Sequence, residues 1–288
     1  MNVKIRLANS CYTTCCIFDN IPIVLQYAIL DATGDLFLKG PQNKIQFNFL
    51  TFLGLLILWT LAPGIKAHTR MCCDKLPLPE YEAHYQISWH GIKSGRSHHK
   101  LYRRQDGSYH VEVKSTPYLT IVPIRHFESS EFIFQKGKIK PLNYQYNIRE
   151  ARRHKQGNVK FDWQNKTLTN SLAKDPWIAP LPFNIQDKLT HTLMLRLDLK
   201  KGLSNLTYPV AENDKFKTYT FTVLGFENIQ TKIGTLETLK LEHVSQRGYR
   251  TTLWLAKKLD YLPILVNQAR QGTIIGRAEI ISLTNSTA

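Results

Sequence analysis

Residues 81–89, with the sequence YEAHYQISW, alternate between apolar or aromatic side chains and polar ones. In an extended chain every second side chain points to the same face. One face of this segment would carry Tyr81, Ala83, Tyr85, Ile87 and Trp89. A period of two over such a length is typical of a strand with one buried face. This feature constrains the chain to a sheet that buries one side.

The same alternation recurs through the rest of the chain. Asp106-Gly107 lies between two strand-like arms in residues 101–113, which is a hairpin signal. Further strands are predicted at residues 130–135, 138–148, 158–163, 217–226, 234–244, 250–256, 262–270 and 273–283. The sequence therefore predicts a mainly β protein, with a meander of roughly ten antiparallel strands.

One segment, residues 183–202, departs from this period. Ile185, Leu189, Leu193 and Leu197 recur every four positions, which favours an amphipathic helix that ends near Gly202. A long curved antiparallel sheet, or an open barrel, would bury the apolar stripe if this one helix packed across it. Such an arrangement can leave a hollow for an apolar ligand.

The apolar stretch within residues 44–67 is intermediate in length between a secretory signal and a membrane span. Its preceding lysines, its Pro63-Gly64 break and the small residue Ala67 favour a signal peptide. An inner-membrane anchor formed by residues 44–65 is the alternative. We expect residues 1–43 to be a leader assigned from a start codon set too far upstream, and a genuine long cytoplasmic leader is the alternative. Residues 68–288 are then a single mature β-rich domain in the periplasm of a Gram-negative bacterium.

The chain carries a formal net charge of +16, which predicts attraction to anionic surfaces such as lipid headgroups or polyanionic glycans. The densest basic run contains Arg149, Arg152 and Arg153, a candidate anion patch whose alternative is a solvated strand end and turn. The run lacks the interleaved aromatic residues that nucleic-acid binding uses, so no nucleic-acid partner is predicted.

Local signatures of catalysis are missing from the sequence. It contains no G-x-S-x-G, H-E-x-x-H, P-loop or G-x-G-x-x-G motif, and no acidic calcium loop. His84 and His90 would share one strand face, where His98 or His110 could join them around a metal, although histidines on such a face are usually just solvated. The adjacent Cys72 and Cys73 cannot supply a tetrahedral zinc site unaided. We predict no catalytic residue, no metal and no cofactor, and enzymatic activity stays open.

Several short motifs occur in a fixed order along the chain. They are Tyr81-x-Ala83-x-Tyr85 followed by Gly91-Ile92 and Gly95; Ser130-x-Phe132 with Gly137, Ile139 and Pro141 before Tyr144; Asp187-x-Leu189-Thr190, which opens the helix; YTFTVLGFENIQTKIGTLETLK from Tyr219; and RTTLWLAKKLDYLPI from Arg250. In order and spacing the chain resembles the bacterial exported family of domain of unknown function 3108. The resemblance implies an envelope protein with an open antiparallel barrel, similar in outline to the periplasmic lipoprotein carriers.

The residues that carry the resemblance also have structural interpretations. Gly225 and Gly234 suit a bulge and a turn, and Pro263 suits the start of a strand or an edge. Glu227 and Arg250 are candidates for an ion pair between neighbouring strands. Tyr85 is likewise predicted to have a structural role rather than to contact a ligand.

Three classes of function remain. The first is a carrier for a lipid or another apolar or amphipathic envelope molecule, with Leu189, Leu193 and Trp254 lining its cavity. The second is a structural or assembly factor that contacts envelope proteins, an anionic membrane surface or an anionic polymer. The third is a hydrolase whose catalytic residues are scattered in sequence.

Overall fold

The structure is a computed structural model that describes residues 74–118, 125–150, 153–172, 176–212 and 215–285. It also describes two short paired strands, β1 (Ala28–Leu30) and β2 (Leu36–Leu38). The chain divides into two compact units at residues 72 and 73. The predicted signal peptide at 44–67, most of the predicted leader at 1–43, and Cys72 and Cys73 lie outside the described residues.

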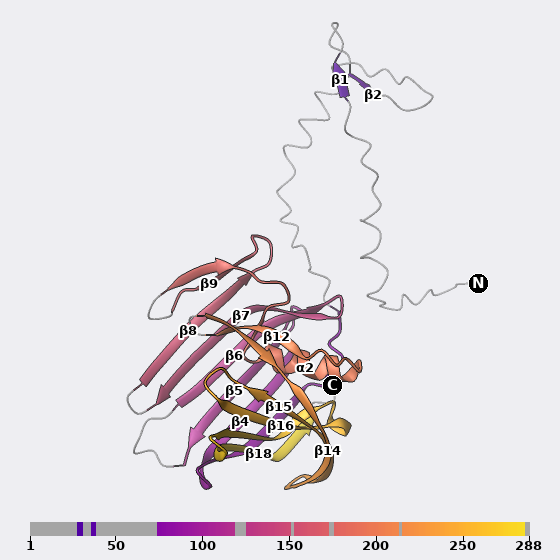
Figure 1. Cartoon of the computed structure of the whole chain (residues 1–288). Coiled ribbons are helices and arrows are strands. Elements are labelled where there is room, and N and C mark those ends of the chain that lie inside the picture. Colours follow the sequence, from indigo (N-terminus) through magenta and orange to yellow (C-terminus); the bar gives the residue numbers. More distant parts are fainter. Residues whose placement is uncertain are drawn as a thin grey trace, which may run out of the picture. The chain divides into compact units, whose positions relative to one another are not determined.

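A thirteen-stranded antiparallel sheet forms the body of the second unit (Figure 1). Its first eight strands are β3 (Tyr81–Trp89), β4 (Ile92–Arg103), β5 (Tyr109–Pro117), β6 (Arg125–Gln135), β7 (Lys138–Glu150), β8 (Arg153–Asp162), β9 (Thr167–Asn170) and β10 (Trp177–Pro180). Its last five are β14 (Thr222–Thr231), β15 (Gly234–Val244), β16 (Tyr249–Ala256), β17 (Leu262–Arg270) and β18 (Thr273–Asn285). The prediction of a mainly β, antiparallel fold is confirmed, including the β4–β5 hairpin.

The two runs of strands meet in the middle of the sheet. The order is β10-β9-β8-β7-β6-β5-β4-β3-β18-β17-β16-β15-β14. β3 pairs with β18 so that Tyr81 lies opposite Asn285 and Trp89 opposite Gly276. β10 and β14 are the two edges, so the sheet is open rather than a closed barrel.

A smaller sheet contains β11 (Gln186–Asp187), β12 (Thr207–Glu212) and β13 (Lys215–Thr220). The sequence predicted one strand over residues 217–226, but the chain leaves the small sheet and enters the large one at Phe221. The backbone N–H of Phe221 donates to the carbonyl of Leu206 at 3.0 Å, so this residue belongs to neither ladder. The predicted strand is therefore two strands in two sheets.

The predicted helix is α2 (Thr190–Lys200), and it ends just before Gly202, as expected. Its start differs from the apolar spacing, because Asp187 closes the first turn. One carboxylate oxygen of Asp187 accepts the N–H groups of Leu189 and Thr190, both at 2.8 Å. Ile185 therefore lies before the helix and packs in a separate hydrophobic cluster. Nearly every residue of α2 is buried.

Two hydrophobic clusters hold the domain together. The larger packs α2 against the inner face of β3, β4, β5, β16 and β17. The smaller comprises Tyr144, Tyr146, Val159, Phe161, Leu168, Ile185 and Ala211. Within the described residues, no helix has the length and apolar character needed to cross a bilayer.

The structural predictions for Gly225, Gly234 and Pro263 are confirmed. Gly225 has a φ of +130° where β14 shifts register by one residue, and Gly234 has a φ of +113° in the β14–β15 turn. Both values fall in a region that residues with a Cβ rarely adopt. Pro263 is the second residue of β17, and its carbonyl accepts the Tyr85 hydroxyl at 2.8 Å.

The predicted ion pair between Glu227 and Arg250 is wrong. The two residues are on β14 and β16, and β15 lies between those strands. Arg250 pairs with Glu242 across the β15–β16 ladder, while Glu227 lies 3.1 Å from Lys240. Each residue fixes one neighbouring strand, with a different partner.

Candidate functional site

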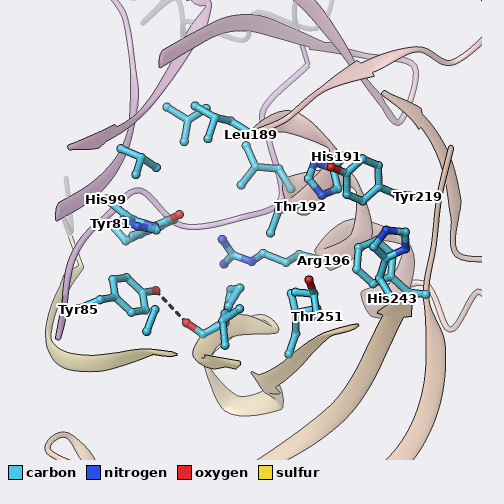
Figure 2. Close-up of a pocket in the computed structure, with 18 residues that line it drawn as sticks. Tyr81, Tyr85, His99, Leu189, His191, Thr192, Arg196, Tyr219, His243 and Thr251 are labelled. Carbon is cyan, nitrogen blue, oxygen red and sulfur yellow. Dashed lines mark hydrogen bonds between the residues drawn. The ribbon is translucent and has the colours of Figure 1, made fainter. Parts of the chain in front are cut away.

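A cavity of about 300 Å³ lies between α2 and the inner face of the large sheet (Figure 2). Three parts of the chain form its walls: α2, the strands β3 to β5, and the segment from β13 to β18. Much of the wall is aliphatic, from Val111, Val113, Leu189, Leu193, Leu253 and Val266. The 18 lining residues include no aspartate or glutamate.

Two of the three residues expected to line a hollow do so. Leu189 and Leu193 face the cavity, but Trp254 is not among its lining residues. Successive residues of a strand face opposite ways, and on β16 it is Leu253 that reaches the cavity. The buried indole of Trp254 instead donates its N–H to Glu227 and lies under Lys240, whose ammonium is 5.1 Å from the ring centroid. Whether Leu189 and Leu193 touch a ligand stays a prediction.

The side chain of Arg196 extends from α2 into the middle of the cavity region (Figure 2). It is 1% exposed, and its Nε donates to the carbonyl oxygen of Asp260 at 2.9 Å. Its Nη1 is buried and has no hydrogen-bond partner within the part of the chain that the structure describes. The guanidinium carbon lies 5.3 Å from the ring centroid of Tyr81. Burial lowers the pKa of Arg196 from its ordinary value, but a guanidinium remains charged in proteins.

Aromatic rings form the wall beside the helix N-terminus. The ring of His191 lies 4.8 Å from that of Tyr219, which in turn stacks on His243 at 4.6 Å. Burial lowers the pKa of His191 to about 4, although the hydrogen bond between its Nδ1 and the carbonyl of Asp187 acts to raise that pKa. A carbonyl can only accept, so Nδ1 carries the proton and Nε2 is left as an acceptor. His191 is thus neutral at pH 7.

His99 occupies the opposite wall, where it packs on Tyr85. Burial lowers the pKa of His99 to about 4, and its Nε2 lies 3.0 Å from the Ser97 hydroxyl. A neutral imidazole beside a serine is half of a nucleophilic pair. However, Ser97 is buried, accepts a hydrogen bond from Ser115 and does not line the cavity. No carboxylate in the described part of the chain is hydrogen-bonded to His99.

A second buried polar cluster surrounds Glu128 on β6. Its carboxylate accepts hydrogen bonds from Tyr144 at 2.5 Å, Lys188 at 3.0 Å and His126. Burial alone would raise the pKa of Glu128, but Lys188, His126 and Tyr144 together hold it well below its usual range. Burial lowers the pKa of Lys188, but the charge of Glu128 outweighs it and the pKa is raised overall. Every atom of this carboxylate is satisfied, so the cluster is structural.

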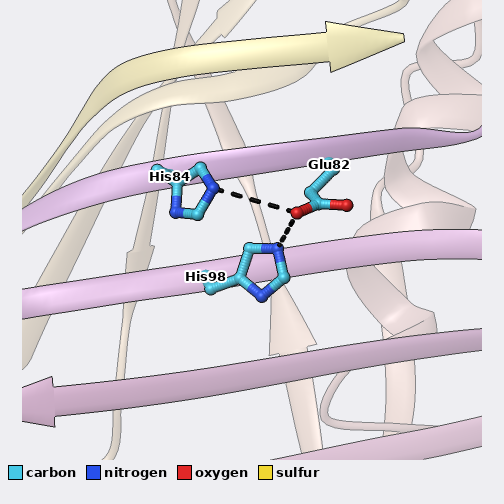
Figure 3. Close-up of side chains that lie close together, drawn as sticks. All are labelled: Glu82, His84 and His98. Atoms are coloured by element: carbon cyan, nitrogen blue, oxygen red, sulfur yellow. Dashed lines mark ion pairs between the residues drawn. The ribbon is translucent and has the colours of Figure 1, made fainter. Parts of the chain in front are cut away.

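Histidines also meet on the outer face of β3 and β4 (Figure 3). The rings of His84 and His98 stack at 4.6 Å, and Nε2 of His98 lies 2.8 Å from Glu82. The three side chains could offer ligand atoms within 4.8 Å of one another. Lys100 lies 3.4 Å from the same carboxylate and already supplies a positive charge there. His90 is not part of this group, because it has a φ of +47° at the β3–β4 turn.

The candidate anion patch lies at the β7–β8 hairpin. Arg149 is exposed near the end of β7, and Arg153 begins β8. Arg152 lies outside the described residues. An anion-binding role for the three arginines stays a prediction.

Arg196 was not predicted as a site residue, although its position in the sequence gave a reason to predict it. It lies three residues after Leu193 and seven after Leu189, which places it on the same helical face as the apolar stripe. A permanent charge within such a stripe is unusual and could have been singled out. His99, His191 and His243 had no comparable signal, since their grouping depends on pairing between distant strands.

Comparisons with known proteins identify a family and several distant folds. Residues 81–274 match the family described as "Protein of unknown function (DUF3108)". No curated protein matches the chain.

Among solved structures, the chain is similar to a beta-barrel-like protein of domain of unknown function DUF1849 from Brucella abortus. The identity is 12% and the TM-score 0.49, over 73% of this chain and 99% of that one. It also matches MucB, at 11% identity and TM-score 0.31, over 73% of this chain and 54% of that one. A DUF1329 family protein from Desulfovibrio piger matches at 10% identity and TM-score 0.22, over 76% of this chain and 89% of that one. Likenesses this distant carry no argument about function.

Proposed function

We propose, for a chain that belongs to the DUF3108 family of proteins of unknown function, that it binds a small apolar or amphipathic molecule between α2 and the large sheet. The observation that carries this proposal is the cavity of about 300 Å³ with its largely aliphatic wall. Ligand sites are typically concave, mostly apolar and about 300–1,000 Å³ in volume. The cavity is at the small end of that range.

The physical gain comes from removing apolar surface from water. A ligand that buries about 250 Å² of apolar surface gains roughly 6 kcal/mol. Part of that gain offsets the translational and rotational freedom lost on binding. A water occupies about 30 Å³ in the liquid, so the cavity accommodates an apolar body of roughly ten non-hydrogen atoms. Medium-chain compounds such as 1-decanol match this size.

The test fills the cavity from the helix side. Leu193→Trp places an indole where the ligand would lie, so we expect at least a tenfold loss of 1-decanol affinity by isothermal titration calorimetry. Leu203→Trp is the matched control, because Leu203 is exposed and does not line the cavity. Circular dichroism and thermal melting verify the fold of both variants. A wild-type chain that takes up no decanol, or a Leu193→Trp variant that takes it up normally, would count against the proposal.

Export to the periplasm is part of the same proposal. It rests on the apolar stretch at residues 44–67 and on the basic residues before it. N-terminal sequencing of the protein from its native host tests it. A mature chain that begins near residue 68 supports cleavage, whereas a peptide from residues 1–35 contradicts the assignment of a leader.

An assembly role is the second candidate, and the edge strand β14 favours it. Val223, Leu224 and Phe226 on this strand are each about half exposed or more. An unpaired strand edge with apolar side chains can accept a strand from another chain. Leu224→Lys should abolish such an association without changing decanol binding. Cross-linking in the intact cell envelope, followed by identification of the joined protein, compares the variant with the wild type.

A further inference from the structure

Helix α2 places a permanent positive charge in the wall of a largely apolar cavity. Arg196 is 1% exposed, and its Nε donates to the carbonyl oxygen of Asp260 at 2.9 Å. The carboxylate of Asp260 forms its ion pair with Lys200, at 2.5 Å, and acts on Arg196 only through its charge. Among the described residues, the buried Nη1 of Arg196 has no hydrogen-bond partner.

This arrangement is costly in the free protein. A buried charge is normally paired, because leaving it unpaired loses solvation that nothing replaces. No acidic residue is among the 18 described residues that line the cavity, and Tyr81, whose ring centroid lies 5.3 Å from the guanidinium carbon, is an uncharged neighbour. Nothing in the cavity wall therefore neutralises Arg196, and an anion that entered with an apolar body would do so.

Building on the binding function proposed above, we propose that the ligand is a carboxylate with an apolar body of roughly ten non-hydrogen atoms, and that Arg196 binds its carboxylate. The planar fork of a guanidinium matches the two oxygens of a carboxylate. Thr192 and Thr251 also line the cavity near Arg196 (Figure 2), and their hydroxyls can donate to the same head group.

A carboxylate fits the charge of the cavity better than a phosphate does. His99 and His191 are neutral at pH 7, because burial lowers the pKa of each to about 4. Arg196 is thus the permanently charged member of the lining. A phosphate monoester carries a charge of about −1.5 to −2 at pH 7. Such a head group would leave negative charge without a partner, whereas a carboxylate is matched by one guanidinium.

The experiment compares three probes of equal chain length: decanoate, 1-decanol and decyl phosphate. Each is titrated by isothermal calorimetry into the wild type, Arg196→Met and Arg247→Met at pH 7.5. Arg247→Met removes the same charge from an exposed position in the β15–β16 turn, outside both the cavity and the candidate anion patch. It therefore measures general attraction to a basic chain.

We expect the wild type and Arg247→Met to bind decanoate at least tenfold more tightly than decanol. Arg196→Met should lose that preference and still bind decanol. If the wild type binds decanol as tightly as decanoate, recognition of the carboxylate is wrong while the proposed binding function stands. If decyl phosphate binds most tightly, the head group is a phosphate and the carboxylate proposal is also wrong. If no probe binds, the binding function itself fails. The relative affinities of the wild type for the three probes test the carboxylate proposal even if Arg196→Met does not fold.

Discussion

Two buried charged side chains, Glu128 on β6 and Arg196 on α2, have different surroundings in the fold. Glu128 is 5% exposed and is surrounded by Lys188, His126 and Tyr144. Arg196 is 1% exposed and faces a cavity whose described lining contains no acidic residue. One charge completes a polar network, while the other forms no ion pair among the described residues.

The difference separates a structural charge from a candidate binding charge. Removing one member of a satisfied buried pair leaves its partner uncompensated, which is strongly destabilising. Removing a buried charge that forms no ion pair relieves an unfavourable desolvation energy and breaks no stabilising ion pair. The two residues should therefore respond to substitution in different ways, and stability measurements can show whether this contrast is real.

The largest effect is expected at Glu128. Glu128→Ala should lower the free energy of unfolding by about 3 kcal/mol, because Lys188 loses its counter-ion and Tyr144 loses its acceptor. Urea unfolding monitored by circular dichroism measures the change. Glu131→Ala on the same strand is the control, since its ion pair with Arg104 is partly exposed and should contribute about 0.5 kcal/mol. Equal losses in the two variants would contradict the structural role of Glu128.

Acid should weaken the contribution of Glu128. Its folded-state pKa is lowered below the ordinary 4.5, so its contribution is present above pH 4.5 and is lost as the pH falls below that value. His99 and His191, whose pKa values are lowered to about 4 from 6.5, act in the same direction between those two values. In Glu128→Gln the stability should fall less steeply below pH 4.5, by up to about 1.4 kcal/mol per pH unit. Urea midpoints from pH 3 to pH 7 measure the dependence of stability on pH in the wild type and in Glu128→Gln. Equal slopes in the two proteins would show that Glu128 does not contribute to the loss of stability in acid.

The smallest effect is expected at Arg196. Arg196→Met retains the long apolar stem and removes the charge, so the free energy of unfolding should change by less than about 1 kcal/mol. The lost hydrogen bond to Asp260 and the removed cost of an unpaired charge act in opposite directions. Urea unfolding of the ligand-free protein gives the value. A loss above about 3 kcal/mol would show that the charge is already satisfied, and the contrast with Glu128 would disappear.

Much of the fold could be predicted from local pattern alone. The alternation of apolar and polar side chains placed β3 at residues 81–89, and Asp106-Gly107 placed the β4–β5 hairpin. The break at Phe221 could not be predicted, since alternation continues across it while the hydrogen-bond partners change sheet. The motif Asp187-x-Leu189-Thr190 correctly marked the helix start, where the carboxylate of Asp187 accepts the N–H groups of Leu189 and Thr190. The apolar period alone would not have marked it, because that period extends back to Ile185, which lies before the helix.

The site was less predictable than the fold. Leu189 and Leu193 were identified because a helical stripe must face a core, and the cavity lies at that interface. Trp254 was wrongly predicted to line the cavity. Alternation along a strand shows that neighbouring side chains lie on opposite faces of the sheet, but it does not show which face borders the cavity. The partner of Glu227 depends on the pairing of β14 with β15, and the burial of Arg196 depends on elements far apart in the sequence, so neither could be predicted from local pattern.

The pairing of β3 with β18 also affects how the domain is made. The first and last strands of the large sheet meet at its centre, so that contact forms only after residues 273–285 have left the ribosome. Until then the nascent chain presents two half-sheets with open edges at β3 and β17. Such edges invite aggregation, and contacts of long sequence separation form slowly. β18, the last strand of the large sheet in the sequence, therefore joins the two half-sheets. Co-translational protection by a chaperone would matter most just before β18 emerges from the ribosome.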